Sequence, residues 1–257
     1  MEKKYLFFDI DGTLTDRSTG EIVPSAREAL TRLEENGHFV AIATGRAHYK
    51  ARKFTDANGF KNMVCCGGNG CVIDNELVEN IPLDKDGCIK IIHQAEEFGY
   101  GWCVALDDTK DVYMTDDKFL RQVGKRKEPT RYIIDDMLEV EKADAIYKVY
   151  VAIPKEDEEK LTTKELVGHL RFEPEYLMFQ PDNKRGGIIK MMEHLNADIK
   201  DVVVFGDDYN DMDMFCPEWF SIAMGNACQD LKDMASYVTD TNVNDGIKKA
   251  CEYFEWI

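Results

Sequence analysis

The chain has 257 residues, of which 49 are Asp or Glu and 32 are Lys or Arg, so its formal net charge is −17. This excess of acids argues against a general nucleic-acid binder, because binding to a phosphate backbone depends largely on clustered Lys and Arg. With 44% hydrophobic and 32% charged residues, the composition is that of a folded globular protein with one large domain or two smaller ones, and it argues against disorder.

The first third of the chain alternates between strand and helix patterns. A hairpin follows the third strand. The expected order is a strand at 4–8, a helix from the capping box Ser25–Glu28 to Gly37, a strand at 38–43, a helix at 46–58 before Gly59, and a strand at 63–66. This βαβαβ order predicts a parallel sheet with right-handed crossovers.

The last third resumes the same alternation. Apolar strands are expected at 202–205, 220–224 and 237–238, with helices between them and a final helix that ends near Phe254. Continuous apolar strands of this kind are typical of a sheet covered on both faces. We therefore predict an α/β fold in which helices lie on both faces of a parallel sheet.

The segment between these thirds has a different pattern, with longer polar connections. Pro82 and Pro181 punctuate its two ends, as expected of linkers into and out of an inserted domain. We predict a core made of residues 1–82 and 183–257, with residues 83–182 inserted as a second domain.

Two acidic turns follow buried strands. Asp9-Ile10-Asp11-Gly12-Thr13-Leu14 comes directly after the first strand, and Gly206-Asp207-Asp208-Tyr209-Asn210-Asp211 follows the strand that ends at Phe205. Ligands bind at the carboxyl edge of such sheets. If the two strands are neighbours, up to five carboxylates converge there, and they need protons or a cation. A hard oxygen-ligand site of this size suits Mg²⁺.

Two further features suit a phosphoryl group. Thr44 and Gly45 end the second strand and precede a helix, so they offer a hydroxyl and an accessible amide. Lys184 begins the helix that returns to the core and offers a compact positive charge. Carboxylates, a divalent metal, a hydroxyl, an amide and a lysine together are the equipment for phosphoryl transfer.

With these motifs the chain resembles the haloacid dehalogenase superfamily, in particular the Cof-like phosphatases with a type IIB cap. The two acidic turns look like the family's first and fourth motifs, Ala43-Thr44-Gly45-Arg46 like its second, and Lys184 like its third. Asn69-Gly70, Met224-Gly225-Asn226 and Asn242 match recurring phrases of this subgroup. The resemblance implies a Rossmann-like core with an inserted α/β cap.

The resemblance also implies roles for these residues. Asp9 is the expected nucleophile, giving an aspartyl-phosphate, and Asp11 the general acid and then base. The expected Mg²⁺ ligands are Asp9, the main-chain carbonyl of Asp11, and Asp207. The phosphate is expected to meet Ile10, Thr44, Gly45, Lys184 and Asn210, while Asp208 and Asp211 support these ligands.

Some alternatives stay open at this stage. Lys184-Arg185-Gly186 allows either Lys184 or Arg185 to contact the phosphate. The activity could also be that of a phosphomutase, or the chain a non-catalytic module that binds Mg²⁺ and phosphate. Within the insertion, Arg121, Lys125–Lys127 and Arg131 form a basic cluster that suits either a second anionic group of the substrate or a solvated face.

The remaining expectations concern the cell and the partners. We find no apolar run near the roughly 18–20 residues of a membrane span and no signal-peptide pattern, which favours a cytoplasmic protein without a membrane partner. The eight cysteines are scattered without a CxxC motif, which favours reduced thiols. We expect a small phosphorylated metabolite as substrate, no nucleic acid, and a monomer or weak homo-oligomer.

Overall fold

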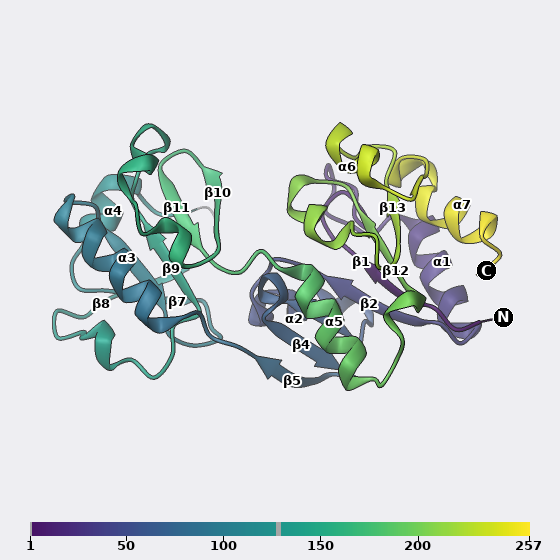
Figure 1. Ribbon diagram of the computed structural model, residues 1–257, viewed down its shortest axis with the longest axis horizontal. Coiled ribbons are helices and arrows are strands. Elements are labelled where there is room, and N and C mark those ends of the chain that lie inside the picture. Colours follow the sequence, from purple (N-terminus) through teal and green to yellow (C-terminus); the bar gives the residue numbers. More distant parts are fainter. Residues whose placement is uncertain (1, 127–129) are drawn as a thin grey trace. The chain divides into compact units, whose positions relative to one another are not determined.

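The computed structural model describes residues 2–126 and 130–257, and it divides the chain into two compact units (Figure 1). The first unit comprises Met1–Arg46, Lys50–Glu79 and Asn183–Ile257. The second comprises Ala47–Tyr49 and Asn80–Asp182, so most of it is one insertion in the sequence of the first.

A mostly parallel sheet forms the centre of the first unit. In the described part of the chain its order is β14-β13-β12-β1-β2-β3-β4-β5, with β4 antiparallel to β3. The strands are β1 (Tyr5–Phe8), β2 (Phe39–Ala43), β3 (Met63–Cys65), β4 (Gly70–Ile73), β5 (Glu76–Asn80), β12 (Val202–Gly206), β13 (Phe220–Ala223) and β14 (Tyr237–Val238). The predicted hairpin is β4 and β5, whose turn residues Asp74 and Asn75 both have positive φ.

Helices cover both faces of this sheet, as the alternating pattern predicts. One apolar cluster packs α1 (Pro24–Glu35), α2 (His48–Asn58) and α7 (Gly246–Tyr253) on one face, and α1 and α7 lie side by side (Figure 1). The other face is covered by α5 (Lys184–His194), α6 (Gln229–Met234) and the 3-10 helix η6 (Tyr209–Met214). The short 3-10 helices of this unit are η1 (Cys66–Gly68), η5 (Ile199–Asp201) and η7 (Asn242–Asn244). The predicted α/β fold class is confirmed.

The predicted capping box at the start of α1 is wrong. The helix begins at Pro24, its N-cap is Val23, and the buried hydroxyl of Ser25 has no hydrogen-bond partner among the described residues. Proline favours the first helical position because its φ is already helical and its missing N–H is not needed there. Ser25 therefore falls inside the first turn rather than at the cap. Similarly, α2 begins at His48 rather than at Arg46.

The second unit has a six-stranded sheet in its described residues, in the order β10-β11-β9-β6-β7-β8. One face packs against α3 (Lys85–Glu97), and the other receives Phe119 of α4 (Lys118–Val123). The strands are β6 (Trp102–Ala105), β7 (Asp111–Met114), β8 (Arg131–Ile134), β9 (Lys148–Val151), β10 (His169–Glu173) and β11 (Tyr176–Phe179). The short 3-10 helices of this unit are η2 (Val140–Lys142), η3 (Lys155–Lys160) and η4 (Lys164–Leu166).

Two global features bear on the sequence expectations. Among the described residues, no helix combines the length and the apolar character that crossing a bilayer would require. None of the eight cysteines, all of which lie among the described residues, forms a disulfide bond.

Candidate active site

The two acidic turns lie at the ends of neighbouring strands. β1 and β12 pair in parallel, with Phe8 opposite Phe205, and the amide of Asp9 donates to the carbonyl of Phe205 at 3.1 Å. The turn after each strand therefore starts at the same edge of the sheet. The sequence left open whether these two strands are neighbours, and the structure shows that they are.

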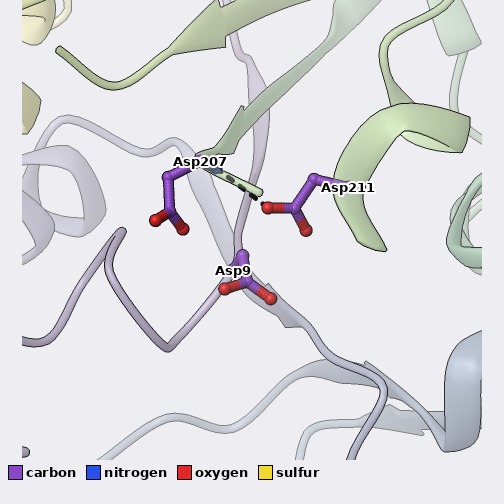
Figure 2. Close-up of side chains that lie close together, drawn as sticks. All are labelled: Asp9, Asp207 and Asp211. Carbon is purple, nitrogen blue, oxygen red and sulfur yellow. Dashed lines mark hydrogen bonds between the residues drawn. The ribbon is translucent and has the colours of Figure 1, made fainter. Parts of the chain in front are cut away.

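Three carboxyl groups meet at this edge. Asp9, Asp207 and Asp211 each offer an oxygen, and these three atoms lie within 4.8 Å of one another. The three side chains are turned toward a common region (Figure 2). All three residues are at most 5% exposed. Three carboxylates this close and this dry repel one another, so the cluster requires positive charge or protons.

Lys184 supplies one of the required charges. It is the first residue of α5 and is buried, and its Nζ donates to Asp9 Oδ1 at 2.8 Å and to Asp211 Oδ1 at 2.6 Å. Burial opposes the charged amine, but the carboxylates of Asp211 and Asp9 outweigh it and raise the pKa of Lys184. The lysine is therefore a permanent cation in the cluster.

The acids remain only partly compensated. Burial, together with the neighbouring Asp211, raises the pKa of Asp9 to about 7 and that of Asp207 to about 6, from an ordinary value of 3.8. Asp211 is held by three donors, because its Oδ2 accepts from the amides of Asp207 and Asp208 while its Oδ1 accepts from Lys184. The sequence expected Asp211 behind the metal ligands, and it lies in the same carboxylate group as Asp9 and Asp207.

The first turn is shaped by a close approach to Asp207. Gly12 has φ +95°, and a Cβ there would overlap the Asp207 carboxylate, so only glycine fits. The hydroxyl of Thr13 donates to Asp207 Oδ1 at 3.1 Å. Asn226 Nδ2 donates to the carbonyl of Gly12 at 2.8 Å and to Asp207 Oδ2 at 3.2 Å. The two turns are thus tied together through the Asp207 carboxylate.

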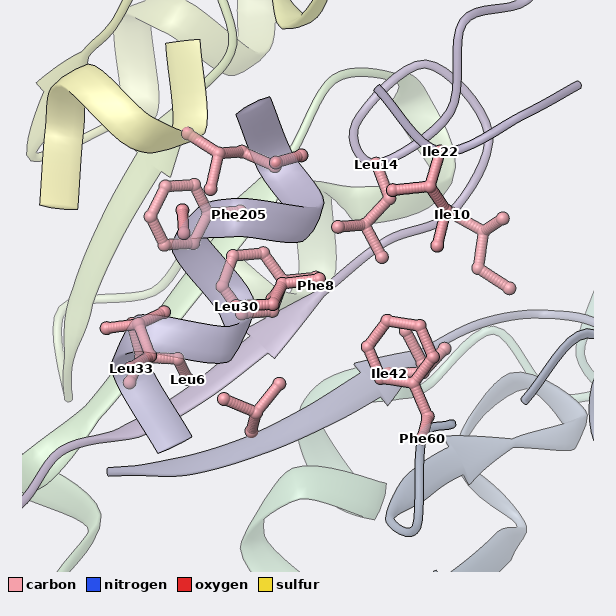
Figure 3. Close-up of a cluster of buried hydrophobic side chains, with 14 of the residues drawn as sticks. Leu6, Phe8, Ile10, Leu14, Ile22, Leu30, Leu33, Ile42, Phe60 and Phe205 are labelled. Atoms are coloured by element: carbon pink, nitrogen blue, oxygen red, sulfur yellow. The ribbon is translucent and has the colours of Figure 1, made fainter. Parts of the chain in front are cut away.

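The core behind the turns holds them in place. Leu6 and Phe8 of β1, and Ile10 just after it, are buried in the cluster that packs against Leu30 and Leu33 of α1 (Figure 3). Because neighbouring residues of a strand point to opposite faces, the burial of Phe8 and Ile10 leaves Asp9 facing the other way. The apolar residues on either side of Asp9 therefore fix the direction of its carboxylate.

Asp11 and Asp208 lie apart from the carboxylate group. The Asp11 side chain is 66% exposed, and Arg46 Nη2 donates to both of its oxygens, at 2.7 and 2.8 Å. Asp208 is the N-cap of η6 and accepts from the amide of Tyr209 at 2.9 Å. Its other oxygen accepts from Arg17 at 3.0 Å.

The remaining predicted phosphate ligands lie on neighbouring elements of the first unit. Thr44 and Gly45 follow β2, which pairs with β1, and Thr44 is buried. Asn210 is the second residue of η6. Of the alternatives Lys184 and Arg185, only Lys184 bonds Asp9; the Arg185 guanidinium pairs with Glu218.

Three side chains at the site were not assigned a role from the sequence. In the sequence, Asn226 and Asn242 stand out only as parts of motifs that recur in the subgroup. In the structure, Asn242 Nδ2 donates to the main-chain carbonyl of Thr15 at 2.8 Å. Arg17 carried no signal, yet its Nη2 donates to Asp207 Oδ2 at 2.8 Å. Such contacts depend on how loops fold back, which local sequence patterns do not encode.

The basic cluster of the insertion is dispersed among local partners. Arg121 pairs with Asp117, Arg131 pairs with Asp111, and Arg126 lies over the ring of Tyr150 at 3.9 Å. Lys127 lies outside the described residues. The three arginines therefore favour the interpretation of ordinary surface and packing contacts over that of a joint anion site.

The chain is similar to known proteins over nearly its whole length. A model of the haloacid dehalogenase-like hydrolases matches residues 6–251. The chain is 30% identical over 253 residues, 97% of each protein, to "Putative phosphatase YkrA" of Bacillus subtilis strain 168. A solved hypothetical protein from Geobacillus kaustophilus HTA426 superposes with a TM-score of 0.83 at 26% identity, covering 100% of both chains. The subclass IIB sugar phosphatase BT4131 superposes with a TM-score of 0.78 at 25% identity, covering 99% of this chain and 100% of that one.

Proposed function

The chain belongs to the haloacid dehalogenase-like hydrolases, and we propose that it is a Mg²⁺-dependent phosphatase that hydrolyses a small phosphorylated metabolite through an aspartyl-phosphate. The observation that carries this proposal is the buried carboxylate of Asp9, which meets Asp207 and Asp211 within 4.8 Å and is bonded by Lys184. We further propose that residues 83–182 act as the cap of this enzyme.

The donor set fits Mg²⁺. The atoms that converge are carboxylate oxygens, without a His or Cys ligand among the three residues, and hard divalent cations prefer such ligands. The raised pKa values of Asp9 and Asp207 also indicate that nearby positive charge does not fully compensate the negative charge of the cluster. Asp9, Asp207 and the main-chain carbonyl of Asp11 would hold the ion. When bound, it would offset the repulsion between the Asp9 carboxylate and a phosphate dianion.

The chain's own residues supply the rest of the reaction. An oxygen of Asp9 attacks phosphorus, the bond from phosphorus to the leaving oxygen breaks, and that oxygen takes a proton from Asp11. Water then attacks the phosphorus of the aspartyl-phosphate, Asp11 removes a proton from it, and Asp9 is released with inorganic phosphate. Arg46 positions Asp11 by bonding both of its oxygens.

Other groups hold the transferred phosphoryl oxygens. Lys184 already bonds Asp9, so its ammonium would lie beside a phosphoryl group attached there. Thr44, Gly45, the amide of Ile10 and Asn210 would complete the contacts from the neighbouring strand ends. Preorganised donors of this kind supply most of the stabilisation in phosphoryl transfer.

The test is phosphate release by the purified chain, measured over a panel of sugar phosphates, nucleotides and pyridoxal phosphate at constant Mg²⁺. Sugar phosphates are a natural first choice because BT4131 is a sugar phosphatase. We expect release that stops with EDTA and with Asp9→Asn. Activity that survives either change would contradict the proposal, and a sugar phosphate returned with its phosphoryl group moved would indicate a mutase.

A further inference from the structure

Arg17 reaches back from the loop before α1 to the second acidic turn. Its loop is closed by two bonds to Asp16, from the amide of Gly20 to the main-chain oxygen at 2.7 Å and from the amide of Ser18 to the side chain at 2.8 Å. From there a single nitrogen, Nη2, donates to Asp207 Oδ2 at 2.8 Å and to Asp208 Oδ2 at 3.0 Å. One cation is thus shared between a buried acid and its exposed neighbour.

Arg17 differs in kind from the other donors to Asp207. Thr13 on Oδ1 and Asn226 on Oδ2 are neutral, and a neutral donor can share a carboxylate oxygen with a metal ion. A guanidinium carries a full charge at every pH at which the protein is folded. A divalent cation bound to Asp207 would lie a few ångströms from that charge, where like charges repel strongly in a partly buried setting.

From this geometry we propose that Arg17 competes with the divalent cation for the carboxylate of Asp207 and thereby sets the metal affinity of the site. The inference rests on the proposed function, because it takes Asp207 as a metal ligand. It assigns Arg17 a role that is separate from binding substrate: the residue weakens metal binding rather than supporting it.

Asp208 lowers the free-energy cost of moving the Arg17 guanidinium away from Asp207, because it offers a second ion-pair partner. Its side chain is 41% exposed, and that of Arg17 is 58% exposed, so the guanidinium can leave Asp207 and still keep an ion pair in water. Asp207, at 2% exposure, has no such freedom. The buried acid can therefore exchange one cation for another, while the arginine keeps a partner on the rim of the site.

The test is a titration of metal-free protein with Mg²⁺ by calorimetry, without substrate. Arg17→Gln removes the competing charge, and we expect its Kd for Mg²⁺ to be about fivefold lower than that of the wild type, the upper end of what a partly exposed ion pair contributes. Arg17→Lys keeps the charge and is expected to stay within about threefold of the wild type.

Arg52→Gln is the matched control. Arg52 is 61% exposed and pairs with Asp56 on α2, so its loss changes the net charge equally but should leave the Kd unchanged. Thermal melts in EDTA verify that each variant is folded. If Arg17→Gln binds Mg²⁺ as the wild type does, or more weakly, Arg17 does not compete and the inference is wrong. If the wild type binds no Mg²⁺ yet releases phosphate, the metal requirement of the proposed function fails instead.

Discussion

Asp9, the proposed nucleophile, is buried at a cost in folding free energy. Its pKa is raised from 3.8 to about 7, mainly by burial and by the charge of Asp211. Because the raised pKa belongs to the folded state, the folded protein holds a proton that the unfolded chain has released between about pH 4 and pH 7. The free energy of unfolding of the metal-free protein should therefore fall as pH rises through this window.

Asp9→Asn removes the charge and keeps the shape, so it should stabilise the metal-free protein. At 1.36 kcal/mol per pKa unit, the shift corresponds to at most about 4 kcal/mol at pH 8 and to about 2 kcal/mol at pH 5, where the folded wild type is mostly protonated. For a chain of this length each 1 kcal/mol is worth roughly 2–4 °C in Tm. A variant that loses activity is thus expected to gain stability.

The assay is thermal and urea unfolding in EDTA at pH 5 and pH 8, with Asp56→Asn as the control because that acid is 60% exposed and pairs only with Arg52 in the described ion pairs. We expect the control to change the unfolding free energy by less than about 0.5 kcal/mol. Saturating Mg²⁺ should stabilise the wild type more than Asp9→Asn. An Asp9→Asn protein that melts at or below the wild type at pH 8 would refute the reasoning.

Three further predictions concern the support of the site. Lys184→Met should cost about 3–5 kcal/mol of unfolding free energy, since it removes the buried cation that pairs with both Asp9 and Asp211. In the same urea titration Arg185→Gln should cost under about 1 kcal/mol. Gly68→Ala should be strongly destabilising because φ is +105° and a Cβ would overlap the main-chain oxygen of Asn183; Gly20→Ala, with φ +73° and open space, should cost only about 1–2 kcal/mol. Asn226→Ala should weaken Mg²⁺ binding about tenfold by calorimetry, because it releases both the Gly12 carbonyl and Asp207. An unchanged Kd would show that the remaining donors, Thr13 and Arg17, suffice to hold the carboxylate.

The sequence allowed the fold class to be predicted because its signals are local. Apolar runs mark the strands, Gly59 and Gly37 end helices with positive φ, and acidic turns follow directly on β1 and β12. The predicted family and the prediction of a phosphatase enzyme are also confirmed. The start of α1 was mispredicted because Pro24 and Ser25 compete for the same boundary and proline prevails.

The site was only partly predictable. That Lys184 rather than Arg185 bonds Asp9 follows from the direction in which α5 begins, which spacing alone leaves open. The contacts of Arg17 and Asn226 with Asp207 join residues about 190 and 19 positions apart, and they depend on the folded loops. The described arginines of the basic cluster do not form a joint site, because each of them contacts a partner within its own unit.

The central claim is that Asp9 carries the phosphoryl group during turnover. The most direct measurement is an acid quench of the enzyme turning over a phosphate monoester with Mg²⁺, followed by borohydride reduction and peptide mass spectrometry, which converts an aspartyl-phosphate to homoserine. We predict homoserine at position 9 and none in Asp9→Asn. Homoserine at position 11, or rapid turnover with an unmodified Asp9, would contradict the account.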